Sequence, residues 1–215
     1  MQYYQDLTII KSPDISPYFI WSKLYTQLHL ALVELQHPNS VSEIGVSFPE
    51  YQYIKENNKT IMTLGCKLRI FSHKKEMLEQ LNISHWLERL KDYVHILSIQ
   101  NVPSNVTEHL VVKRLRQRTN NDKYTRDYAK KHNLSFEEAK EARVQRFMEV
   151  HNVTLQESLE HYENPVLKRR PFIIMQSLRT KQQYSLEIEQ LRVNGPVAGA
   201  FSSYGLSSTT TVPAW

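Results

Sequence analysis

The order of strand-like and helix-like segments in the first hundred residues constrains this fold more than any other feature of the sequence. Residues 2–11 carry the tyrosines and isoleucines typical of a strand. Ser16 and Pro17 then open a helix, because serine is a favoured cap and proline suits the first turn. The apolar residues that follow recur at helical spacing, at Ile20, Trp21, Leu24, Leu28 and Leu32. A strand followed at once by such a helix predicts a mixed α and β fold.

The segments up to residue 99 continue this alternation. Strand candidates at 43–48 and 62–71 are separated by a polar stretch, rich in Asn and Lys, that is typical of a loop. A second helix is predicted over 73–91 and a strand over 93–99. The order strand, helix, strand, strand, helix, strand is that of the ferredoxin-like fold, which often serves as a platform for RNA. We therefore predict the α+β class, with an N-terminal ferredoxin-like (βαββαβ) domain.

A change in composition follows residues 101–105 (NVPSN), and we interpret it as a domain junction. A chain of 215 residues suits either one large domain or two small ones. We predict two: a ferredoxin-like domain over 1–102, and a C-terminal α+β domain with a basic helix over 103–215.

The densest basic segment lies at residues 113–131, where eight Lys or Arg accompany two acids. A helix capped within 119–121 would bring Lys123, Arg126 and Lys130 onto one stripe that can lie along phosphates. A solvated helix face is the alternative, but an excess of one sign, on a chain of formal charge +5, favours a polyanionic partner. The eight cations are Lys113, Arg114, Arg116, Arg118, Lys123, Arg126, Lys130 and Lys131.

Helix and strand signals continue beyond this segment. Asn133 offers a left-handed helix stop, and Ser135 with Glu138 forms a capping box for a helix that runs to residue 150 or so. Thr154 with Glu157 predicts a third helix in the same way. Two strands and a loop-like tail, rich in Gly, Ser, Thr and Pro, are predicted at 171–179, 183–191 and 194–215.

Several classes of protein are disfavoured by what the sequence lacks. Cys66 has no second cysteine to pair with, no signal peptide is visible, and no stretch approaches the roughly 20 apolar residues that span a bilayer. We expect a cytoplasmic protein without a membrane partner. The nine histidines are scattered, and neither a zinc motif nor a phosphate-binding glycine loop occurs. The sequence therefore predicts no metal and no cofactor.

Acid–base chemistry by histidine remains, and it suits RNA because the ribose 2′-hydroxyl is a nucleophile within the substrate. His29, in the first predicted helix, is the candidate base. On pattern alone, a single helical histidine is more often packed or exposed without a catalytic role. Ser177 and Tyr204 are weaker candidates on composition, being a strand hydroxyl and a ring in a Ser-Gly turn.

Four segments carry a more specific signal when they are taken together. They are HLALVELQHPNSVSEIGVSFPEY, KKHNLSFEEA, PFIIMQSLRTKQQYSLEI and SSYGLSS. In this order, over nearly the whole chain, they resemble the CRISPR-repeat endoribonucleases of the type I-F systems. The combination of a helical histidine, IGVSFP after it and a terminal SYGLS is more specific than any one piece.

The resemblance implies a metal-independent endoribonuclease that cuts CRISPR precursor RNA at the 3′ base of the repeat stem-loop. Attack by the 2′-hydroxyl would leave a 2′,3′-cyclic phosphate and a 5′-hydroxyl. By position, His29 is the base, Ser177 holds the ribose or hydroxyl in line, and Tyr204 orients the histidine. The enzyme would stay on the crRNA hairpin with other subunits of a type I-F surveillance complex, and would meet DNA only through that complex.

The resemblance also assigns RNA contacts. Arg114 and Arg116 fall where the family reads base edges at the foot of the stem, and Tyr184 where an aromatic ring stacks on the terminal pair. The sequence departs from the family at Arg116, where glutamine is usual, and near Arg179, where a serine is usual. Residues 144–165 look like an insertion. The other expected RNA-binding residues are Arg118, Lys123, Arg126, Lys130 and Lys131, the last four through phosphates.

Two alternatives stay open. The chain could be a binding subunit that caps the guide hairpin without cutting it, its catalytic candidates being present but misplaced. It could instead be a generic ferredoxin-like RNA-binding or ribosomal protein, in which the combination of His29, Ser177 and Tyr204 is coincidental. Cleavage of a repeat hairpin, compared with binding to it, separates the alternatives from the enzyme.

Overall fold

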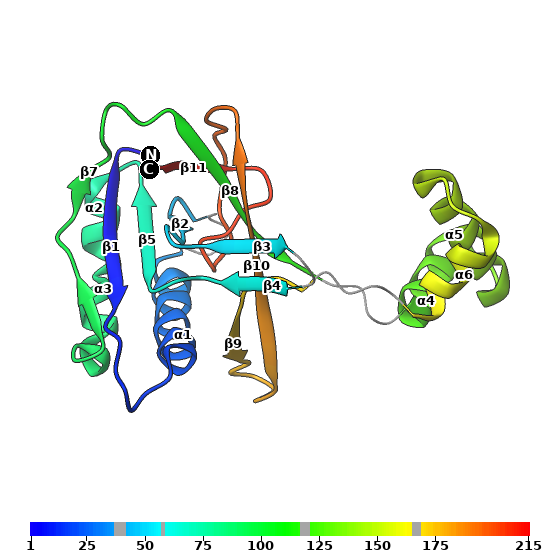
Figure 1. The fold of residues 1–215 in the computed structure, drawn as a ribbon, viewed down its shortest axis with the longest axis horizontal. Coiled ribbons are helices and arrows are strands. Elements are labelled where there is room, and N and C mark those ends of the chain that lie inside the picture. Colours follow the sequence, from blue (N-terminus) through cyan, green and yellow to red (C-terminus); the bar gives the residue numbers. More distant parts are fainter. Residues whose placement is uncertain (37–41, 57–58, 117–120, 165–168) are drawn as a thin grey trace. The chain divides into compact units, whose positions relative to one another are not determined.

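The computed structural model describes residues 1–36, 42–56, 59–116, 121–164 and 169–215. Its contacts group the chain into two compact units (Figure 1). Unit 1 consists of residues 1–115 and 170–215, and unit 2 of residues 116–169. The predicted boundary after residue 102 coincides with neither limit of these units, and it stays a prediction.

An antiparallel sheet forms the first layer of unit 1. Its strands are β1 (Tyr3–Ile9), β2 (Gly45–Ser47), β5 (Lys67–Ser72), β6 (Val94–Ile96) and β7 (Gln100–Asn101). The main path runs β2-β5-β1-β6, and β7 also pairs with β1. Counted along the chain, the four main strands lie in the order second, third, first, fourth, which is the ferredoxin-like arrangement. The predicted fold class is confirmed.

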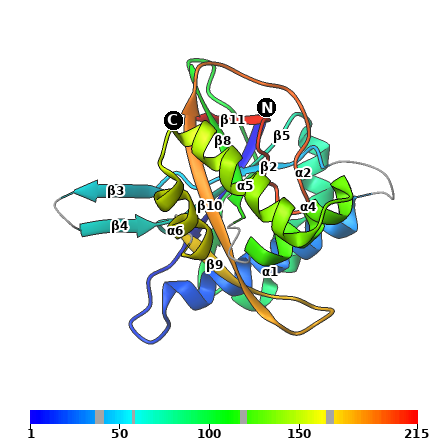
Figure 2. The same ribbon diagram turned by 90° about the vertical axis from the view of Figure 1, so that its right-hand side faces the viewer.

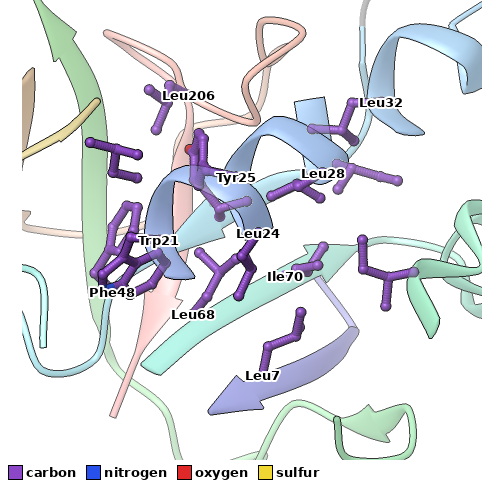
Figure 3. Packing of buried hydrophobic residues seen from close by; sticks show 14 of the residues in the cluster. Leu7, Trp21, Leu24, Tyr25, Leu28, Leu32, Phe48, Leu68, Ile70 and Leu206 are labelled. Carbon is purple, nitrogen blue, oxygen red and sulfur yellow. The ribbon is translucent and has the colours of Figure 1, made fainter. Parts of the chain in front are cut away.

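The helix α1 (Pro17–Leu35) packs with the apolar face that its spacing predicts, so this helix is also confirmed. Leu24 and Leu28 are fully buried in one cluster with Leu68 and Ile70 of β5 (Figure 3). Burying such a side chain stabilises the fold by roughly 1.5–3 kcal/mol. The helix that carries His29 is therefore held by the main core.

A second antiparallel sheet completes unit 1. It contains β8 (Glu108–Leu115), β9 (Phe172–Gln176), β10 (Gln183–Val193) and β11 (Thr211–Ala214), in the order β11-β8-β10-β9. The strand predicted over 183–191 is confirmed, the strand predicted over 171–179 is shorter than predicted because it ends at Gln176, and the tail is not all loop. Its residues Thr211 and Val212 are buried where β11 pairs with β8, because β-branched side chains suit a covered strand. Since α1 contacts β9 as well as β1, the helix links the two sheets.

The polar stretch that was predicted to be a loop is a β-hairpin instead. Strand β3 (Gln52–Glu56) pairs with β4 (Lys59–Thr63), and the hairpin projects from the larger sheets (Figure 2). Most of its side chains are exposed, so the alternation that marks a half-buried strand is missing from its sequence. The predicted strand 62–71 is correspondingly two elements, because the backbone turns at Gly65, whose φ is +74°, between β4 and β5.

The second helical segment is shorter than predicted and is broken. The sequence predicts one helix over 73–91, whereas Asn82 adopts a left-handed conformation with φ 42° and ends its first part. The strand predicted over 93–99 contracts to β6, followed by β7. The helical pieces are α2 (Lys75–Leu81), α3 (Ile83–Trp86) and the 3-10 helix η1 (Glu88–Leu90).

Unit 2 is a group of three helices, α4 (Asn121–His132), α5 (Phe136–His151) and α6 (Leu155–Glu163). The capping boxes of Ser135 with Glu138 and of Thr154 with Glu157 are confirmed. Asn133 has φ 54°, as its predicted role as a helix stop requires. Of the predicted cap at 119–121, the first two residues lie outside the described residues. Within the described parts of the chain, no helix is both long and apolar enough to cross a bilayer.

Candidate active site

A cavity of about 430 Å³ in unit 1 brings together residues that are far apart in the sequence. Its lining comes from α1, β8, β9, β10 and the segment before β11. The cavity is lined by all three predicted catalytic residues, His29, Ser177 and Tyr204, and also by Arg114 and Tyr184. Five of the predicted site residues thus share one pocket.

His29 lies in the second half of α1, and one hydrogen bond fixes its ring. Its Nδ1 lies 2.8 Å from the backbone carbonyl oxygen of Ser203. A carbonyl oxygen only accepts, so Nδ1 is the donor and carries a proton. In the neutral imidazole the other nitrogen, Nε2, then has the free electron pair. This is the tautomer that a general base acting through Nε2 needs.

The ring of Tyr204 covers the imidazole. The His29 and Tyr204 rings are stacked, with their centres 4.1 Å apart and 4° between their planes. The hydroxyl of Tyr25, on the same helix as His29, donates to the carbonyl oxygen of Tyr204 across 2.8 Å. Burial raises the pKa of Tyr25, so its hydroxyl keeps the proton that it donates. The backbone of Tyr204 is therefore anchored to the helix that carries the histidine.

A tight turn presents Tyr204 to this helix. The Ser202 N–H donates to the Leu206 carbonyl oxygen, and the Gly205 N–H to the Ser202 carbonyl oxygen, each across 2.8 Å. Gly205 has φ +69°, and a Cβ at this position would lie 2.7 Å from Cγ1 of Val46. Only glycine fits both the backbone conformation and the space. The glycine of the Ser-Tyr-Gly sequence is therefore the residue that this turn requires.

A second tyrosine and an arginine extend the cluster. The hydroxyl oxygens of Tyr184, on β10, and Tyr204 are 2.8 Å apart. The guanidinium carbon of Arg114, on β8, lies 5.4 Å from the ring centre of Tyr184 and 5.7 Å from that of Tyr204, within cation–π range. Burial, and then the hydrogen bond with Tyr204, raises the pKa of Tyr184 to about 12. Tyr184 is therefore a neutral phenol at physiological pH.

Ser177 lies just beyond β9, and not within a strand as predicted, because β9 ends at Gln176. Its Oγ accepts a hydrogen bond from the Thr180 N–H across 3.2 Å. Its backbone N–H donates to the Gln182 carbonyl oxygen across 2.9 Å. A hydroxyl that accepts in this way still has its own proton to donate. The turn between β9 and β10 thus holds Ser177 at the cavity with a donor to offer.

The remaining predicted RNA-binding residues lie in unit 2. On α4, Thr125 and Ala129 are buried, and the opposite face is exposed. Arg116 is exposed, and Arg118 lies outside the described residues. The exposed cations of the helix are Lys123, Arg126, Lys130 and Lys131. The predicted positive stripe therefore exists on a helix, and its role in RNA binding stays a prediction.

Two contributors to the site were missed by the sequence analysis. Ser203 acts through its backbone carbonyl oxygen, which has no side-chain signature. Tyr25 could have been found, because it precedes His29 by four residues and so shares its helix face. In the ranges that the structure describes, no three His, Cys, Asp or Glu side chains gather as metal ligands would.

The fold and the pocket define an α+β protein of the ferredoxin-like type with a histidine–tyrosine cavity. Residues 4–215 match the family model described as CRISPR-associated protein (Cas_Csy4). The chain belongs to this family, and the resemblance to the type I-F repeat-processing endonucleases is thereby confirmed.

Two curated relatives span almost the same length. The CRISPR-associated endonuclease Cas6/Csy4 of Escherichia coli (strain UTI89 / UPEC) is 27% identical over 216 residues, covering 99% of each chain. The protein of the same description from Pseudomonas aeruginosa (strain UCBPP-PA14) is 29% identical over 218 residues, again covering 99% of each chain. A solved structure, described as an RAMP protein binding different RNA substrates, is 12% identical with a TM-score of 0.33, covering 99% of this chain and 100% of that one. The ferredoxin-like fold follows from the strand order β2-β5-β1-β6 of the first sheet.

Proposed function

We propose that this protein is a metal-independent endoribonuclease that cuts CRISPR precursor RNA at the 3′ base of the repeat stem-loop. Its family and its two endonuclease relatives support the processing of CRISPR RNA. The observation that carries the proposal is the fixed tautomer of His29. The hydrogen bond from Nδ1 to Ser203 leaves Nε2 as a proton acceptor in a residue that lines the cavity.

The proposed reaction follows from this tautomer. Nε2 of His29 takes the proton of the 2′-hydroxyl, and the 2′-oxygen attacks the adjacent phosphorus. The bond from phosphorus to the 5′-oxygen breaks, its electron pair stays on that oxygen, and a proton from solvent converts it into a 5′-hydroxyl, while His29 returns the proton that it took to solvent. The other product carries a 2′,3′-cyclic phosphate. A positioned general base contributes about 10²–10⁴-fold to such a rate.

The other pocket residues orient the reactants. Tyr204 restricts the tilt of the imidazole by stacking on it, and Ser177 has a hydroxyl proton with which to hold the ribose in line. Arg114 offers a guanidinium that suits the O6 and N7 edge of guanine at the foot of the stem. The exposed cations of α4, with Arg116 and Arg118, bind the backbone and bases of the hairpin.

The first test uses EDTA and a modified substrate. Purified protein is incubated in EDTA with its host's labelled repeat RNA, and with the same RNA bearing a 2′-deoxy sugar immediately upstream of the expected cut. We expect cleavage of the first RNA alone. Cleavage of both would exclude attack by the 2′-hydroxyl, and a requirement for added metal would exclude the metal-free reaction. Tight binding without cleavage would identify a subunit that only caps the hairpin.

We also propose that the cleaved hairpin stays on the protein, so that the two enter a type I-F surveillance complex in the cytoplasm together with its other subunits. The support is the exposed positive stripe of α4, because basic side chains that neutralise RNA phosphates keep the RNA bound at moderate salt. Gel filtration after cleavage should show the hairpin fragment eluting with the protein. Elution of that fragment on its own would contradict retention.

A further inference from the structure

We propose that the Tyr184 hydroxyl is a positioning group that links recognition at the foot of the RNA stem to the alignment of His29. This inference rests on the proposed function and goes beyond the stacking role that the resemblance gives to this aromatic position. Stacking on a base pair needs only a ring, whereas the contact found here is made by the phenol oxygen.

The Tyr204 side chain is held at both of its ends. Its backbone carbonyl oxygen accepts from Tyr25 across 2.8 Å, and its hydroxyl lies 2.8 Å from that of Tyr184. Between these ends the ring lies flat on His29, at 4.1 Å and 4°. A ring fixed at one end alone can tilt, and a tilt of Tyr204 opens this contact. The Tyr184 hydroxyl therefore restricts the orientation of the imidazole without touching it.

Arg114 connects this arrangement to the RNA. Its guanidinium lies over both tyrosine rings, at 5.4 Å and 5.7 Å. Both tyrosine rings contact the same guanidinium, and their hydroxyls contact each other. A movement of the guanidinium therefore changes the positions of both rings. The correct base pair keeps Arg114 in reach of both rings, and a wrong pair draws the guanidinium away from one of them. The identity of the base pair at the foot of the stem then affects the rate of cleavage as well as the affinity for the RNA.

The hydroxyl acts by hydrogen bonding and not by transferring a proton. Burial keeps the pKa of Tyr184 at about 12, so the phenol stays neutral across the pH range in which imidazole works as a base. Removing the oxygen while keeping the ring isolates its role. Tyr184→Phe makes this change, and it retains both stacking and the cation–π contact with Arg114.

The experiment compares Tyr184→Phe with Tyr51→Phe in the full chain. Tyr51 is a matched control in unit 1, because its hydroxyl donates to the Ile188 carbonyl oxygen across 3.2 Å and it does not line the catalytic cavity. Single-turnover cleavage is measured at saturating protein, and Kd is measured with the 2′-deoxy hairpin. Each protein is given the native repeat and a repeat with its lowest base pair reversed.

We expect Tyr184→Phe to cut the native hairpin about three- to tenfold more slowly, as one lost hydrogen bond predicts, with its Kd within about twofold of the wild type. The rate penalty that the wild type shows for the reversed pair should shrink in the variant, while the penalty in Kd persists. Tyr51→Phe should match the wild type in every measurement. Tyr204→Phe removes the other hydroxyl of the same contact. The double variant with Tyr184→Phe and Tyr204→Phe should therefore cut no more slowly than the slower of the two single variants.

Three results would overturn the inference. An unchanged rate would show that the hydroxyl positions nothing, and a parallel fall in rate and affinity would show a plain RNA contact. A rate penalty for the reversed pair as large as in the wild type would remove the link to recognition. If the wild type itself fails to cut the native repeat, the proposed function fails first, and this inference falls with it.

Discussion

The two compact units are stabilised by different kinds of interaction. Unit 1 buries large side chains, among them Tyr25, Phe48 and Phe71. In the described part of unit 2, no side chain larger than valine is buried. The buried residues of unit 2 are Thr125, Ala129, Ala139, Val144 and Ser158. Because burial contributes roughly 25 cal/mol per Å² of apolar surface, unit 1 gains far more from its core.

Hydrogen bonds stabilise unit 2 where unit 1 relies on large buried apolar side chains. The hydroxyls of Thr125 and Tyr162 are 2.7 Å apart, and Arg143 donates to Thr125 Oγ1 across 2.7 Å. Asn121 donates from its side chain to the Tyr162 carbonyl oxygen across 2.6 Å. These bonds join the first half of α4 to both α5 and α6. The comparison teaches that the pocket around His29 stands on a packed apolar core, whereas the basic helix is held mainly by polar contacts.

The largest difference should appear in catalysis. His29→Ala is expected to lower single-turnover cleavage about 10²–10⁴-fold, because it removes the only imidazole that lines the described pocket, while the hairpin Kd stays nearly constant. Rates are measured on labelled repeat RNA, with His85→Ala, in the exposed part of α3, as the control. Unchanged cleavage would remove His29 from the mechanism.

Core truncation should show the reliance of unit 1 on packing. Leu68 is fully buried, and Leu68→Ala is expected to lower the free energy of unfolding by about 2–5 kcal/mol through lost burial and a cavity. Urea unfolding followed by tryptophan fluorescence measures the change. Leu191→Ala on β10, where the leucine is 42% exposed, should cost less than about 0.5 kcal/mol. Equal losses would contradict the assigned core.

Charge reversal tests what unit 2 contributes to binding. Arg126→Glu with Lys130→Glu should weaken hairpin binding by tenfold or so and flatten the dependence of log Kd on log salt, because fewer counterions are released. The paired control is Arg89→Glu with Lys91→Glu, which makes the same charge change at exposed sites in unit 1. A salt slope equal to that of the wild type would argue against the role of α4.

A single hydroxyl should matter in unit 2. Tyr162→Phe removes the contact with Thr125, and we expect a loss of about 1 kcal/mol in the opening free energy of α4 amides, measured by hydrogen exchange on the full chain. Tyr128→Phe, whose ring would keep its contact with His132, is the control on the same helix. Unaltered exchange in Tyr162→Phe would show that the polar cluster does not hold the helix.

The smallest effect should come from lowering the pH. The hydroxyl and N–H of Ser135 hold the pKa of Glu138 below its ordinary value of 4.5. A lowered folded pKa means that this contribution is present above the unfolded value and is lost as pH falls through the folded one. After correction for the intrinsic exchange rate, the protection of amides at the start of α5 should therefore fall below pH 4.5, and Ser135→Ala, which removes the hydroxyl and keeps the N–H, should weaken that dependence. An identical pH response in both proteins would exclude the capping box as its source.

Local signals predicted unit 2 better than unit 1. The capping boxes and the Asn133 stop depend on neighbours in the sequence, so the end of α4 and the starts of α5 and α6 could be placed. The β3–β4 hairpin was missed because exposed strands need no apolar alternation. The break at Asn82 was missed because apolar spacing continues through it.

The candidate active site was predicted by resemblance and not by pattern. Nothing in the spacing of His29, Ser177 and Tyr204 states that they meet, because tertiary packing of α1 against both sheets brings them together. Their neighbours Arg114 and Tyr184 were likewise assigned as RNA contacts, and their packing against Tyr204 could not be foreseen. Backbone groups such as the Ser203 carbonyl have no sequence signature.

The distance along the chain between His29 and its carbonyl partner has a consequence for protein synthesis. The two are 174 residues apart, so the ribosome makes the proposed base long before it makes the groups that fix its tautomer and cover its ring. A nascent chain that includes α1 but not yet Ser203 lacks the carbonyl group that orients the imidazole. Under the proposed mechanism, such a chain should cut no RNA until the turn around Tyr204 has been translated and has packed against α1, so the fold begins to form before the nuclease is active.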